Sequence, residues 1–356
     1  MGDGTPTVGA RIAGIGVAHP PPVGQEELFG GFVARHYQGR ARAKAARIFR
    51  AAGVRQRHPA VNPAVEDLSG TSTGARMQRY LAEALPLGKS AVAAAMGAAD
   101  LDPGDVGLFV VCSCTGYGTP GLDILLARDL GMATSTQRVF VGHMGCYAAL
   151  PGLGVAADFA RARGRPAVLL CLELTSLHAQ PLGAGTGGDE AGQIVAHALF
   201  SDAAAAVAVL PGAGPGYRVL DVAAVTDVAT ADHMTWEVTD LGFRMGLSRR
   251  VPEVLRGQVA GLVDDLLGRY GLGRDEVAGW AVHPGGPKVL DVVEQRLELP
   301  GAALAPSREV LAWHGNCSSA TVLMILDALA VPRDGYAVLL AFGPGLTLYA
   351  VLLRRD

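Results

Sequence analysis

The chain has no long apolar run and no leader-like start. None of its uncharged apolar segments reaches the length of about 18 residues that a membrane-spanning helix needs. Residues 1–10 also lack the basic start and apolar run of a secretory leader. We therefore expect a cytoplasmic protein with no membrane partner.

Cysteine is sparse and irregularly spaced. The five cysteines, an odd number, occur at positions 112, 114, 146, 171 and 317. Cys112 and Cys114 are separated by one residue, too close for the paired spacing of a zinc site, and no histidine pair follows them. We expect no disulfide framework and no metal, and free thiols of which at least one is available as a nucleophile.

An excess of charge of either sign is also missing. The formal net charge is −3 in 356 residues, 50% of the residues are hydrophobic and the mean hydropathy is +0.28. This balance argues against a disordered chain and against a nucleic-acid partner. The length fits two domains, or two similar halves fused around one core.

Apolar segments of strand length alternate with alanine-rich stretches of helical spacing. Residues 252–269 carry apolar side chains at helical spacing and predict an amphipathic helix that ends near Gly271. Buried strands that alternate with helices are typical of the α/β class. The expected strands are residues 108–112, 167–174, 203–210, 279–282, 337–342 and 346–353.

Three pairs of similar segments recur at one separation. The members of each pair share a local pattern: a strand that runs into a loop, a glycine-led turn that opens a helix, and a buried strand. The pairs are centred on Ser113 and His283, Cys146 and Asn316, and Val168 and Val338, each 170 residues apart. Such a repeat predicts two duplicated halves. We place the boundary in the glycine- and proline-rich stretch 211–215, with halves at residues 1–212 and 213–356.

Cys146 is the cysteine with the clearest chemical setting. It follows Gly142 and Gly145 and begins a run of small residues that predicts a helix. A sulfur at the N-terminal end of a helix lies near the positive end of the dipole, which lowers the thiol pKa and favours the nucleophilic thiolate. A buried, inert cysteine is the alternative, because most free cysteines are unreactive.

His283 and Asn316 are the polar residues that the repeat connects to Cys146. His283 ends an apolar strand and precedes a rigid Pro-Gly-Gly-Pro loop, at the end of a strand where α/β proteins carry their sites. Each residue has a structural alternative, a histidine satisfied within the fold and an asparagine that caps a helix. The repeat favours a shared site, because it places Cys146 and Asn316 at equivalent points of two facing halves.

A cysteine, a histidine and an amide together suit acyl transfer. An imidazolium stabilises a thiolate, and the imidazole and the amide donate hydrogen bonds to a thioester oxygen or an enolate. A papain-like hydrolase uses the same three residue types, but there the asparagine orients the histidine. The sequence around Cys146 is not papain-like, and no secretory leader is apparent.

Six segments between residues 110 and 354 resemble type III polyketide synthases, the chalcone synthase-like family, and specifically bacterial-type members. They are VVCSCTGYGTPGLD, MGCYAAL, HALFSDAAAAV, WAVHPGGPKVLDVVEQRL, SREVLAWHGNCSSATVLMILD and AFGPGLTLYAVLLR. The resemblance implies a thiolase-like five-layered αβαβα fold and a homodimer. It also implies CoA thioesters as substrates, no cofactor, and iterative decarboxylative condensation of malonyl-CoA onto an acyl-CoA starter, followed by cyclisation to a pyrone or phenolic product.

The resemblance also implies roles for individual residues. Cys146 matches the acylated nucleophile, and His283 and Asn316 match the pair that promotes decarboxylation and holds the oxyanion. The remaining matches are Phe200 and Phe243 as gatekeepers, Cys114, Thr119, His178, Met234 and Ser318 in the substrate pocket, and Lys44 and Arg47 at the CoA phosphates, with Arg50 beside a third basic position that is Ala51 here. A solvated helix face is the alternative for Lys44 and Arg47.

Several positions depart from the plant members of the family. Ala341 replaces the first glycine of the Gly-Phe-Gly-Pro-Gly loop, Thr119 replaces a methionine, Cys114 and His178 replace threonines, and Met234 replaces a glycine of the cavity wall. Larger side chains at 178 and 234 predict a smaller pocket, an aliphatic starter and few extensions. Cys114 resembles bacterial members, including tetrahydroxynaphthalene synthases.

Two alternatives remain beside the polyketide synthase hypothesis. A ketoacyl synthase III-type enzyme shares the fold and the Cys-His-Asn set, but it condenses once and takes malonyl units from a carrier protein. A non-catalytic homologue that binds acyl thioesters is the other alternative. Retention of all three polar residues argues against it.

Overall fold

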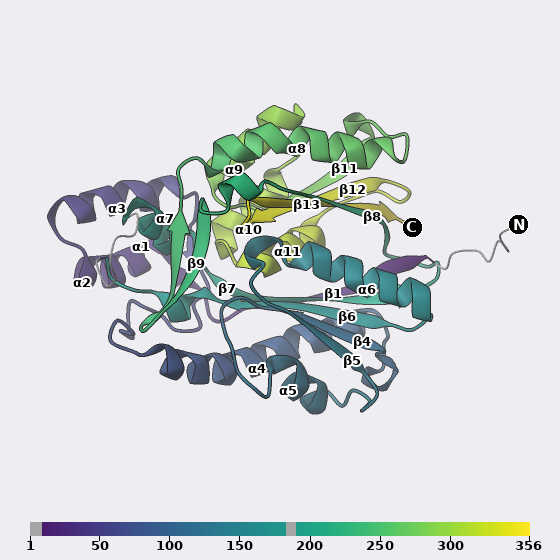
Figure 1. The fold of residues 1–356 in the computed structure, drawn as a ribbon, viewed down its shortest axis with the longest axis horizontal. Coiled ribbons are helices and arrows are strands. Elements are labelled where there is room, and N and C mark those ends of the chain that lie inside the picture. The colour runs from purple at the N-terminus through teal and green to yellow at the C-terminus, as the bar shows by residue number, and fades with distance from the viewer. Residues whose placement is uncertain (1–8, 183–189) are drawn as a thin grey trace, which may run out of the picture.

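The computed structural model of the chain describes residues 9–182 and 190–356 (Figure 1). The first expected half, residues 1–212, therefore contains two stretches, 1–8 and 183–189, that lie outside the described residues. None of the described helices is long and apolar enough to cross a membrane.

The strands are β1 (Ala10–Ala18), β2 (Val23–Gly24), β3 (Gln56–Arg57), β4 (Leu108–Cys112), β5 (Gln137–Val141), β6 (Ala167–Leu174), β7 (Asp202–Pro211), β8 (Tyr217–Thr226), β9 (Met234–Thr239), β10 (Gly242–Leu247), β11 (Val277–Val282), β12 (Tyr336–Gly343) and β13 (Thr347–Arg355). The α-helices are α1 (Gln25–Leu28), α2 (Ala34–His36), α3 (Gly39–Ala51), α4 (Thr73–Ala98), α5 (Leu122–Asp129), α6 (Ala149–Arg163), α7 (Glu190–Leu199), α8 (Val251–Gly268), α9 (Pro287–Leu297), α10 (Ala305–His314) and α11 (Thr321–Ala328). The described residues also form short 3₁₀ or π turns, η1 to η7. Two of them, η3 (Gly145–Tyr147) and η7 (Ser318–Ala320), contribute to the candidate site.

Nine strands form one continuous sheet in the order β11-β12-β13-β8-β1-β7-β6-β4-β5. Its two parts repeat one topology: β1-β7-β6-β4 in the first half corresponds to β8-β13-β12-β11 in the second. In both parts the first two neighbour pairs are antiparallel and the last pair is parallel. A short antiparallel contact between β1 and β8 joins the parts. The duplication expected from the sequence is therefore confirmed, since β4 and β11, α6 and α11, and β6 and β12 occupy equivalent places.

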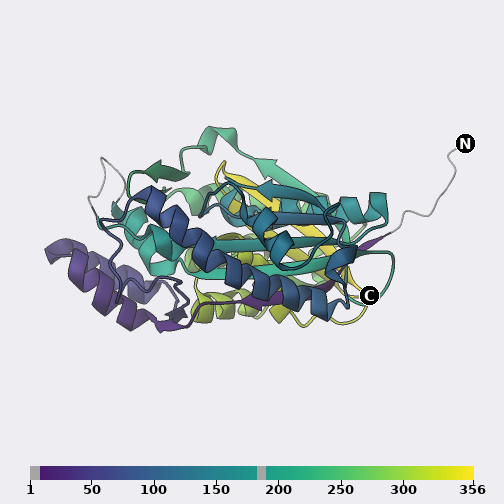
Figure 2. The same cartoon turned by 90° about the horizontal axis from the view of Figure 1, so that it is seen from below.

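Helices cover both parts of the sheet and separate them in the middle, which gives five layers (Figure 1). Helix α4 lies along the outer face of the first part, as Figure 2 shows. Helices α6 and α11 form the central layer, and α8 and α9 cover the second part. Strand β6 is buried along its whole length because helices pack on both of its faces.

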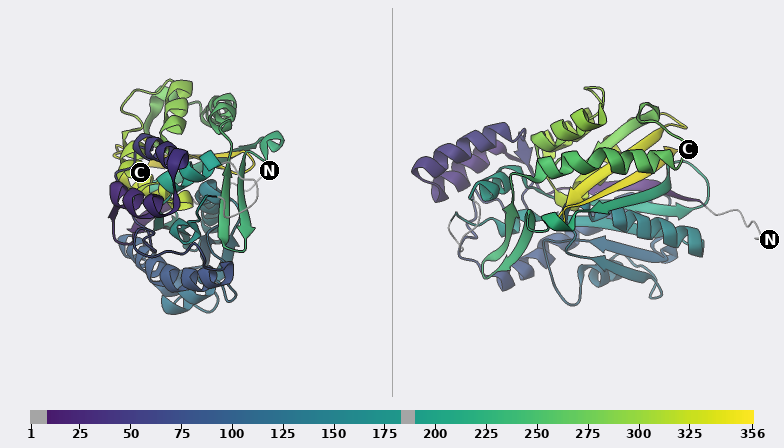
Figure 3. Two further views of the ribbon diagram at one scale, coloured as in Figure 1. Left: turned by 90° about the vertical axis from the view of Figure 1, so that its left-hand side faces the viewer. Right: turned by 45° about the horizontal axis from the view of Figure 1, so that its top comes forward.

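A smaller group of elements gathers at one end of these layers. Helices α1 to α3 form a cap beside α7, and the hairpin β9-β10 lies next to them (Figures 1 and 3). The turns η3 and η7 contact each other and lie where the central helices begin. The cap, the hairpin and the starts of the central helices together position the site.

The predicted strands are confirmed. The predictions for residues 108–112 and 167–174 coincide with β4 and β6, and the other four differ from the observed strands by one or two residues at their ends. The helix predicted at 252–269 is α8, displaced by one residue. Five of the longer strands, β1, β5, β8, β9 and β10, were not predicted.

Candidate active site

Cys146 lies in the turn η3, which runs directly into helix α6. Gly145 precedes it with φ +67°, and a Cβ on this glycine would lie 3.1 Å from Pro344, so the backbone path there favours glycine. The loop that contains Pro344 follows β12 of the second half. The nucleophile candidate is thus held where the two halves meet, and its residue is only 7% exposed.

Burial decides the acidity of the Cys146 thiol. It raises the pKa to about 12; the Glu173 carboxyl raises it as well, while the Ser318 side chain opposes the shift through a hydrogen bond. The expectation of a lowered pKa at this helix start is therefore wrong for the free protein. Loss of hydration disfavours the thiolate more than the short turn and its dipole favour it.

His283 follows strand β11 and is completely buried. Its backbone N–H donates to the carbonyl of Leu340 on β12 at 2.8 Å, and its ring meets Phe342 edge-on at 5.5 Å between centroids. Neither ring nitrogen has a hydrogen-bond partner among the described residues, Cys146 included. Burial lowers the pKa of His283 to about 3, so the ring is neutral at neutral pH.

Asn316 follows α10 and Gly315, whose φ of +71° turns the chain towards the second central helix. Its backbone pairs with the strand-like segment around Phe200: the N–H donates to the Leu199 carbonyl at 2.8 Å, and the carbonyl accepts from Ser201 at 2.9 Å. Its side-chain oxygen accepts from the N–H of Ser318 at 2.9 Å. This bond, from residue i+2 to the side chain of residue i, closes an Asx turn and fixes the orientation of the amide; Asn316 is not the cap of the turn that follows, whose N-cap is Cys317.

A buried acid lies beside Cys146. Glu173, near the end of β6, accepts hydrogen bonds from the N–H of Cys114 at 3.0 Å, from Thr115 at 2.9 Å and from Ser319 at 2.7 Å. The Cys114 sulfur lies 3.5 Å from both carboxyl oxygens and 3.9 Å from the Ser318 hydroxyl. Burial raises the pKa of Glu173 to about 7, and the hydrogen bonds oppose the shift. Burial and the nearby Glu173 also raise the pKa of Cys114.

A cavity of about 40 Å³ opens at Cys146. Four more of the predicted site residues border it, namely Cys114, Phe200, Met234 and Ser318. Its other walls include Thr115, Trp236 and Met245. The first water-sized space around the sulfur is therefore mostly apolar and far smaller than the roughly 300–1,000 Å³ of ligand pockets.

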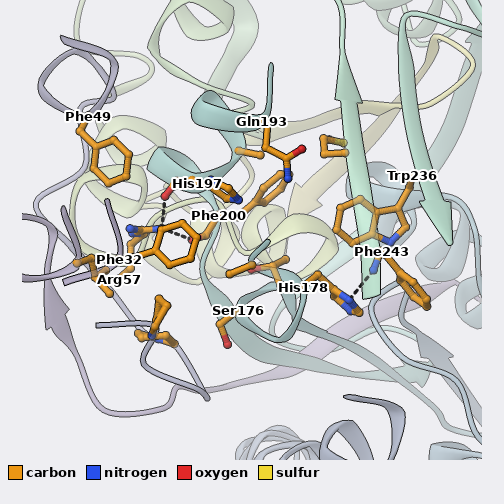
Figure 4. Close-up of a pocket in the computed structure, with 17 residues that line it drawn as sticks. Phe32, Phe49, Arg57, Ser176, His178, Gln193, His197, Phe200, Trp236 and Phe243 are labelled. Carbon is orange, nitrogen blue, oxygen red and sulfur yellow. Dashed lines mark hydrogen bonds between the residues drawn. The ribbon is translucent and has the colours of Figure 1, made fainter. Parts of the chain in front are cut away.

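A second small cavity, of about 60 Å³, shares Phe200 with the first and is lined by His178 and Phe243 (Figure 4). The two rings stack at 4.4 Å, the N–H of Phe243 donates to Nδ1 of His178 at 3.0 Å, and Nε2 of His178 donates to the Thr115 carbonyl at 2.7 Å. Trp236 meets both rings edge-on and donates to the Cys114 carbonyl. Burial lowers the pKa of His178 to about 4, in keeping with one fixed neutral tautomer.

A channel of about 570 Å³ runs between the cap and the second half of the fold. Met234 borders both this channel and the Cys146 cavity, so its side chain stands at their junction. Within residues 9–182 and 190–356, four basic residues and no acidic residue line the channel: Lys44, Arg47, Arg249 and Lys288. The channel also borders Gly286 at the start of α9, where the positive end of the helix dipole favours anions.

Four predicted residues border neither of the two inner cavities nor the channel: His283 and Asn316, which are both buried, and Thr119 and Arg50. Thr119 is exposed on the loop before α5 and borders none of the described cavities. Arg50 lies on the outer face of α3, beside Lys44 and Arg47 but outside the channel. Phe243 borders the cavity of Figure 4 and not the channel.

Sequence reasoning missed four residues of the site. Glu173 is an acid inside an otherwise apolar strand, which is a signal that the sequence offered. Lys288 is one of three lysines and follows the His283 loop directly. Trp236 and Arg249 carried no comparable signal, because their place depends on how the β9-β10 hairpin folds over the site.

Family models for the chalcone and stilbene synthases match almost the whole chain, the N-terminal domain over residues 7–215 and the C-terminal domain over residues 221–355. The chain belongs to this family. It is 37% identical over 329 residues to the 1,3,6,8-tetrahydroxynaphthalene synthase of Streptomyces peucetius subsp. caesius, covering 89% of this chain and 85% of that protein. It is 30% identical over 291 residues to the "alpha-pyrone synthesis polyketide synthase-like Pks18" of Mycobacterium tuberculosis, covering 78% and 72%.

Solved structures agree with this membership. The polyketide synthase PKS-I of the brown alga Ectocarpus siliculosus superposes with a TM-score of 0.89 at 27% identity, covering 98% of this chain and 99% of that one. The C-terminal type III domain of Steely1 from Dictyostelium gives 0.89 at 25% identity, with the same coverage. The protein is thus a type III polyketide synthase with the thiolase-like fold.

Proposed function

We propose that this type III polyketide synthase carries its growing chain on Cys146 and uses His283 and Asn316 to decarboxylate malonyl-CoA and to hold the enolate. The observation that carries this proposal is the fully buried imidazole of His283, with neither nitrogen bonded to another described group. A buried polar group without a partner costs about 1–3 kcal/mol, so such a group suggests a ligand that completes it. A thioester oxygen is an acceptor of the right kind for a neutral ring that keeps one N–H.

Loading of the starter balances without a redox step. The Cys146 sulfur attacks the starter carbonyl, the bond to the CoA sulfur breaks, and the Cys146 proton passes to the departing CoA thiolate. The raised pKa of Cys146 means that the thiol loses its proton as the acyl group arrives. His283, neutral and with a free lone pair, is the proposed carrier of that proton.

Extension uses the same donors a second time. Decarboxylation of malonyl-CoA releases CO2 and leaves an enolate, whose oxygen accepts hydrogen bonds from His283 and Asn316. The enolate carbon attacks the Cys146 thioester, and the Cys146 sulfur leaves as a thiolate. The extended chain is then a CoA thioester, and it is transferred back to Cys146 before the next round. All atoms come from the two thioesters, which is why we propose CoA thioesters as substrates and no cofactor.

The channel supports CoA as the carrier of both substrates. Lys44, Arg47 and Lys288, with Arg249, surround a channel that reaches the Cys146 cavity at Met234. Phosphate groups bind such clusters of charge through charge-assisted hydrogen bonds. We assign Met234 to the junction, and Phe200 and Phe243 to the neighbouring aromatic wall.

The small apolar cavity favours an aliphatic starter and few extensions, ending in a pyrone or a phenolic ring. A second product class has its own support, because the chain is 37% identical to a tetrahydroxynaphthalene synthase. A naphthalene skeleton can be assembled from two-carbon units alone, so malonyl-CoA would then serve as starter and extender. Incubation with malonyl-CoA alone separates the two by the product formed, since the second class gives a hydroxylated naphthalene, whereas the first gives at most a short acetyl-primed product after decarboxylation of malonyl-CoA.

We further propose a homodimer, with the halves of each chain divided near residues 212–213. Strand β5 is the exposed edge of the sheet, and Val139 and Phe140 on it are 38% and 43% exposed. Tyr117, on the same loop as Thr119, is 71% exposed. A partner subunit that covers these side chains would bring Thr119 towards the active site of that partner. A monomer found by light scattering at micromolar concentration would contradict the dimer.

Malonyl-CoA decarboxylation tests the division of labour among the three residues. We expect C146A to form no polyketide but to keep some CO2 release, and H283A and N316A to lose CO2 release by about 100-fold or more. Near-normal release from either of the last two variants would contradict the proposal. The number of malonyl units in the product, counted by mass spectrometry, separates iterative extension from the single condensation of a ketoacyl synthase III.

A further inference from the structure

Three histidines from distant parts of the chain meet behind the active site. His19 follows β1, His58 follows β3, and His314 ends α10. Each offers a ring nitrogen, and these nitrogens all lie within 4.8 Å of one another. None of the three borders the Cys146 cavity, the cavity of Figure 4 or the channel.

The rings lie at the spacing of three ligands of one ion, and because two of the pairs are stacked, at 18° and 17° between planes, the rings turn when their lone pairs meet at the ion. The ring centroids are 4.6 Å apart for His19 and His58, 4.5 Å for His19 and His314, and 5.0 Å for His58 and His314. Zn–N bonds of about 2.0–2.1 Å in tetrahedral geometry place the centroids of neighbouring imidazoles about 5 Å apart, and their nitrogens about 3.3 Å apart. The 3.1 Å between Nδ1 of His314 and Nε2 of His58 is close to that value.

The surrounding hydrogen bonds leave ring nitrogens of His58 and His19 free to bind an ion. Nδ1 of His58 lies 2.9 Å from the Pro20 carbonyl, and Nε2 lies 3.3 Å from the Trp313 carbonyl and 3.1 Å from Nδ1 of His314. In the tautomer that donates from Nδ1 to the nearer carbonyl, Nε2 carries the lone pair that faces His314. A backbone carbonyl on the far nitrogen is the usual support of a metal-bound histidine. Nδ1 of His19 is buried and has no hydrogen-bond partner among the described residues.

The cluster of three rings is accessible from solvent. His19 and His314 are only half-buried, which leaves a path for an ion from solvent.

We propose that His19, His58 and His314 bind one divalent transition-metal ion of the zinc class, with the fourth position open to water. Imidazole ligands suit Zn²⁺, Co²⁺, Ni²⁺ and Cu²⁺, whereas Mg²⁺ and Ca²⁺ require oxygen ligands that this trio lacks.

The ion acts on positioning and stability, because its ligands support the segments behind Asn316. His314 precedes Asn316 by two residues, and the backbone N–H of His58 donates to the Ser201 hydroxyl at 2.8 Å. Ser201 in turn donates its N–H to the Asn316 carbonyl. The ion thus cross-links three segments: the end of β1, the end of β3 and the turn after α10.

The test uses metal-stripped, untagged protein and Co²⁺ as a spectroscopic probe, followed by Zn²⁺ in competition. We expect one Co²⁺ per chain, with d–d absorption of a low-coordinate nitrogen and oxygen site and no thiolate-to-cobalt band, and displacement by one Zn²⁺. H19Q and H314Q should weaken binding by about 100-fold or more. H233Q, which changes a half-buried histidine elsewhere on the chain, should bind as the unchanged protein does.

Zn²⁺ should also raise the melting temperature of the unchanged protein and of H233Q, but not of H19Q or H314Q. This second readout does not depend on activity. Absence of Co²⁺ binding to the unchanged protein at micromolar concentration would overturn the proposal. A thiolate-to-cobalt band, or full binding by H314Q, would overturn it too, because the ion would then lie at cysteines or at other ligands.

Discussion

Replacing Met234 by glycine tests how the pocket limits the product. Met234 is 7% exposed and borders both the 40 Å³ cavity at Cys146 and the 570 Å³ channel. Its side chain occupies roughly 100 Å³ at normal packing density, so its removal adds space beside Cys146 and opens the inner cavity towards the channel. That volume holds one or two further two-carbon units of a growing chain. We therefore expect M234G to lengthen the product by one or two units, or to accept bulkier starters.

The stability cost of M234G is modest enough for the assay. Burial of Met234 between two cavities puts the packing loss near the low end of the usual range, about 2 kcal/mol, and a glycine within β9 adds up to about 1 kcal/mol. Products from aliphatic acyl-CoAs and malonyl-CoA are compared by liquid chromatography and mass spectrometry. M234L, which conserves volume, should keep the original profile, and M234W should shorten the product or stop turnover. An unchanged profile from folded M234G would refute this account of the pocket, as would a preference of the unchanged enzyme for 4-coumaroyl-CoA.

Three further predictions follow from charge and burial. Iodoacetamide should alkylate Cys146 slowly at pH 7 and progressively faster towards high pH, because burial raises its pKa to about 12; fast alkylation well below pH 8 would contradict the burial argument. K288A and K44A should each raise the KM for CoA thioesters on the order of 10-fold with little change in kcat, while the exposed control K89A should not. Glu173 has a folded pKa near 7, above its unfolded value, so the folded state binds more protons between about pH 4.5 and pH 7. The free energy of unfolding should therefore be highest below this window and fall across it by as much as ~3 kcal/mol, whereas E173Q should show no such fall in chemical denaturation at a series of pH values.

The sequence predicts the central strands because their burial leaves a continuous apolar signal. Strands β4 and β6 are covered on both faces, and their bounds match the prediction. Strand β1 was missed because it contains Gly14 and Gly16, which reduce its apolar character. A Cβ at either glycine would lie within 2.3 Å of a carbonyl of α4, so these residues permit close contact between the helix and the strand. That reason is visible only in three dimensions.

The candidate site could be predicted from the sequence only where the internal repeat relates its residues to one another. The repeat at one separation predicts Cys146, His283 and Asn316 as one site. The structure places Cys146 and Asn316 where the halves meet, whereas the contacts of His283 are with Leu340 and Phe342 of its own half. The acidity of Cys146 was not predictable, because it depends on burial by residues of both halves and on Glu173. Likewise, local sequence places Trp236 and Arg249 in a hairpin and a loop, and only the folding of that hairpin over the cavity brings them to the site.

Two cysteines border the inner cavity, so the position of the acyl group is the most direct test of the proposed chemistry. The enzyme is incubated with a starter acyl-CoA in the absence of malonyl-CoA, quenched in acid, digested, and examined by peptide mass spectrometry. We predict one acyl group, on the peptide that contains Cys146, with the Cys114 peptide unmodified and no acylation of C146A. An acyl group on Cys114, or undiminished acylation of C146A, would contradict the assignment of Cys146 as the nucleophile.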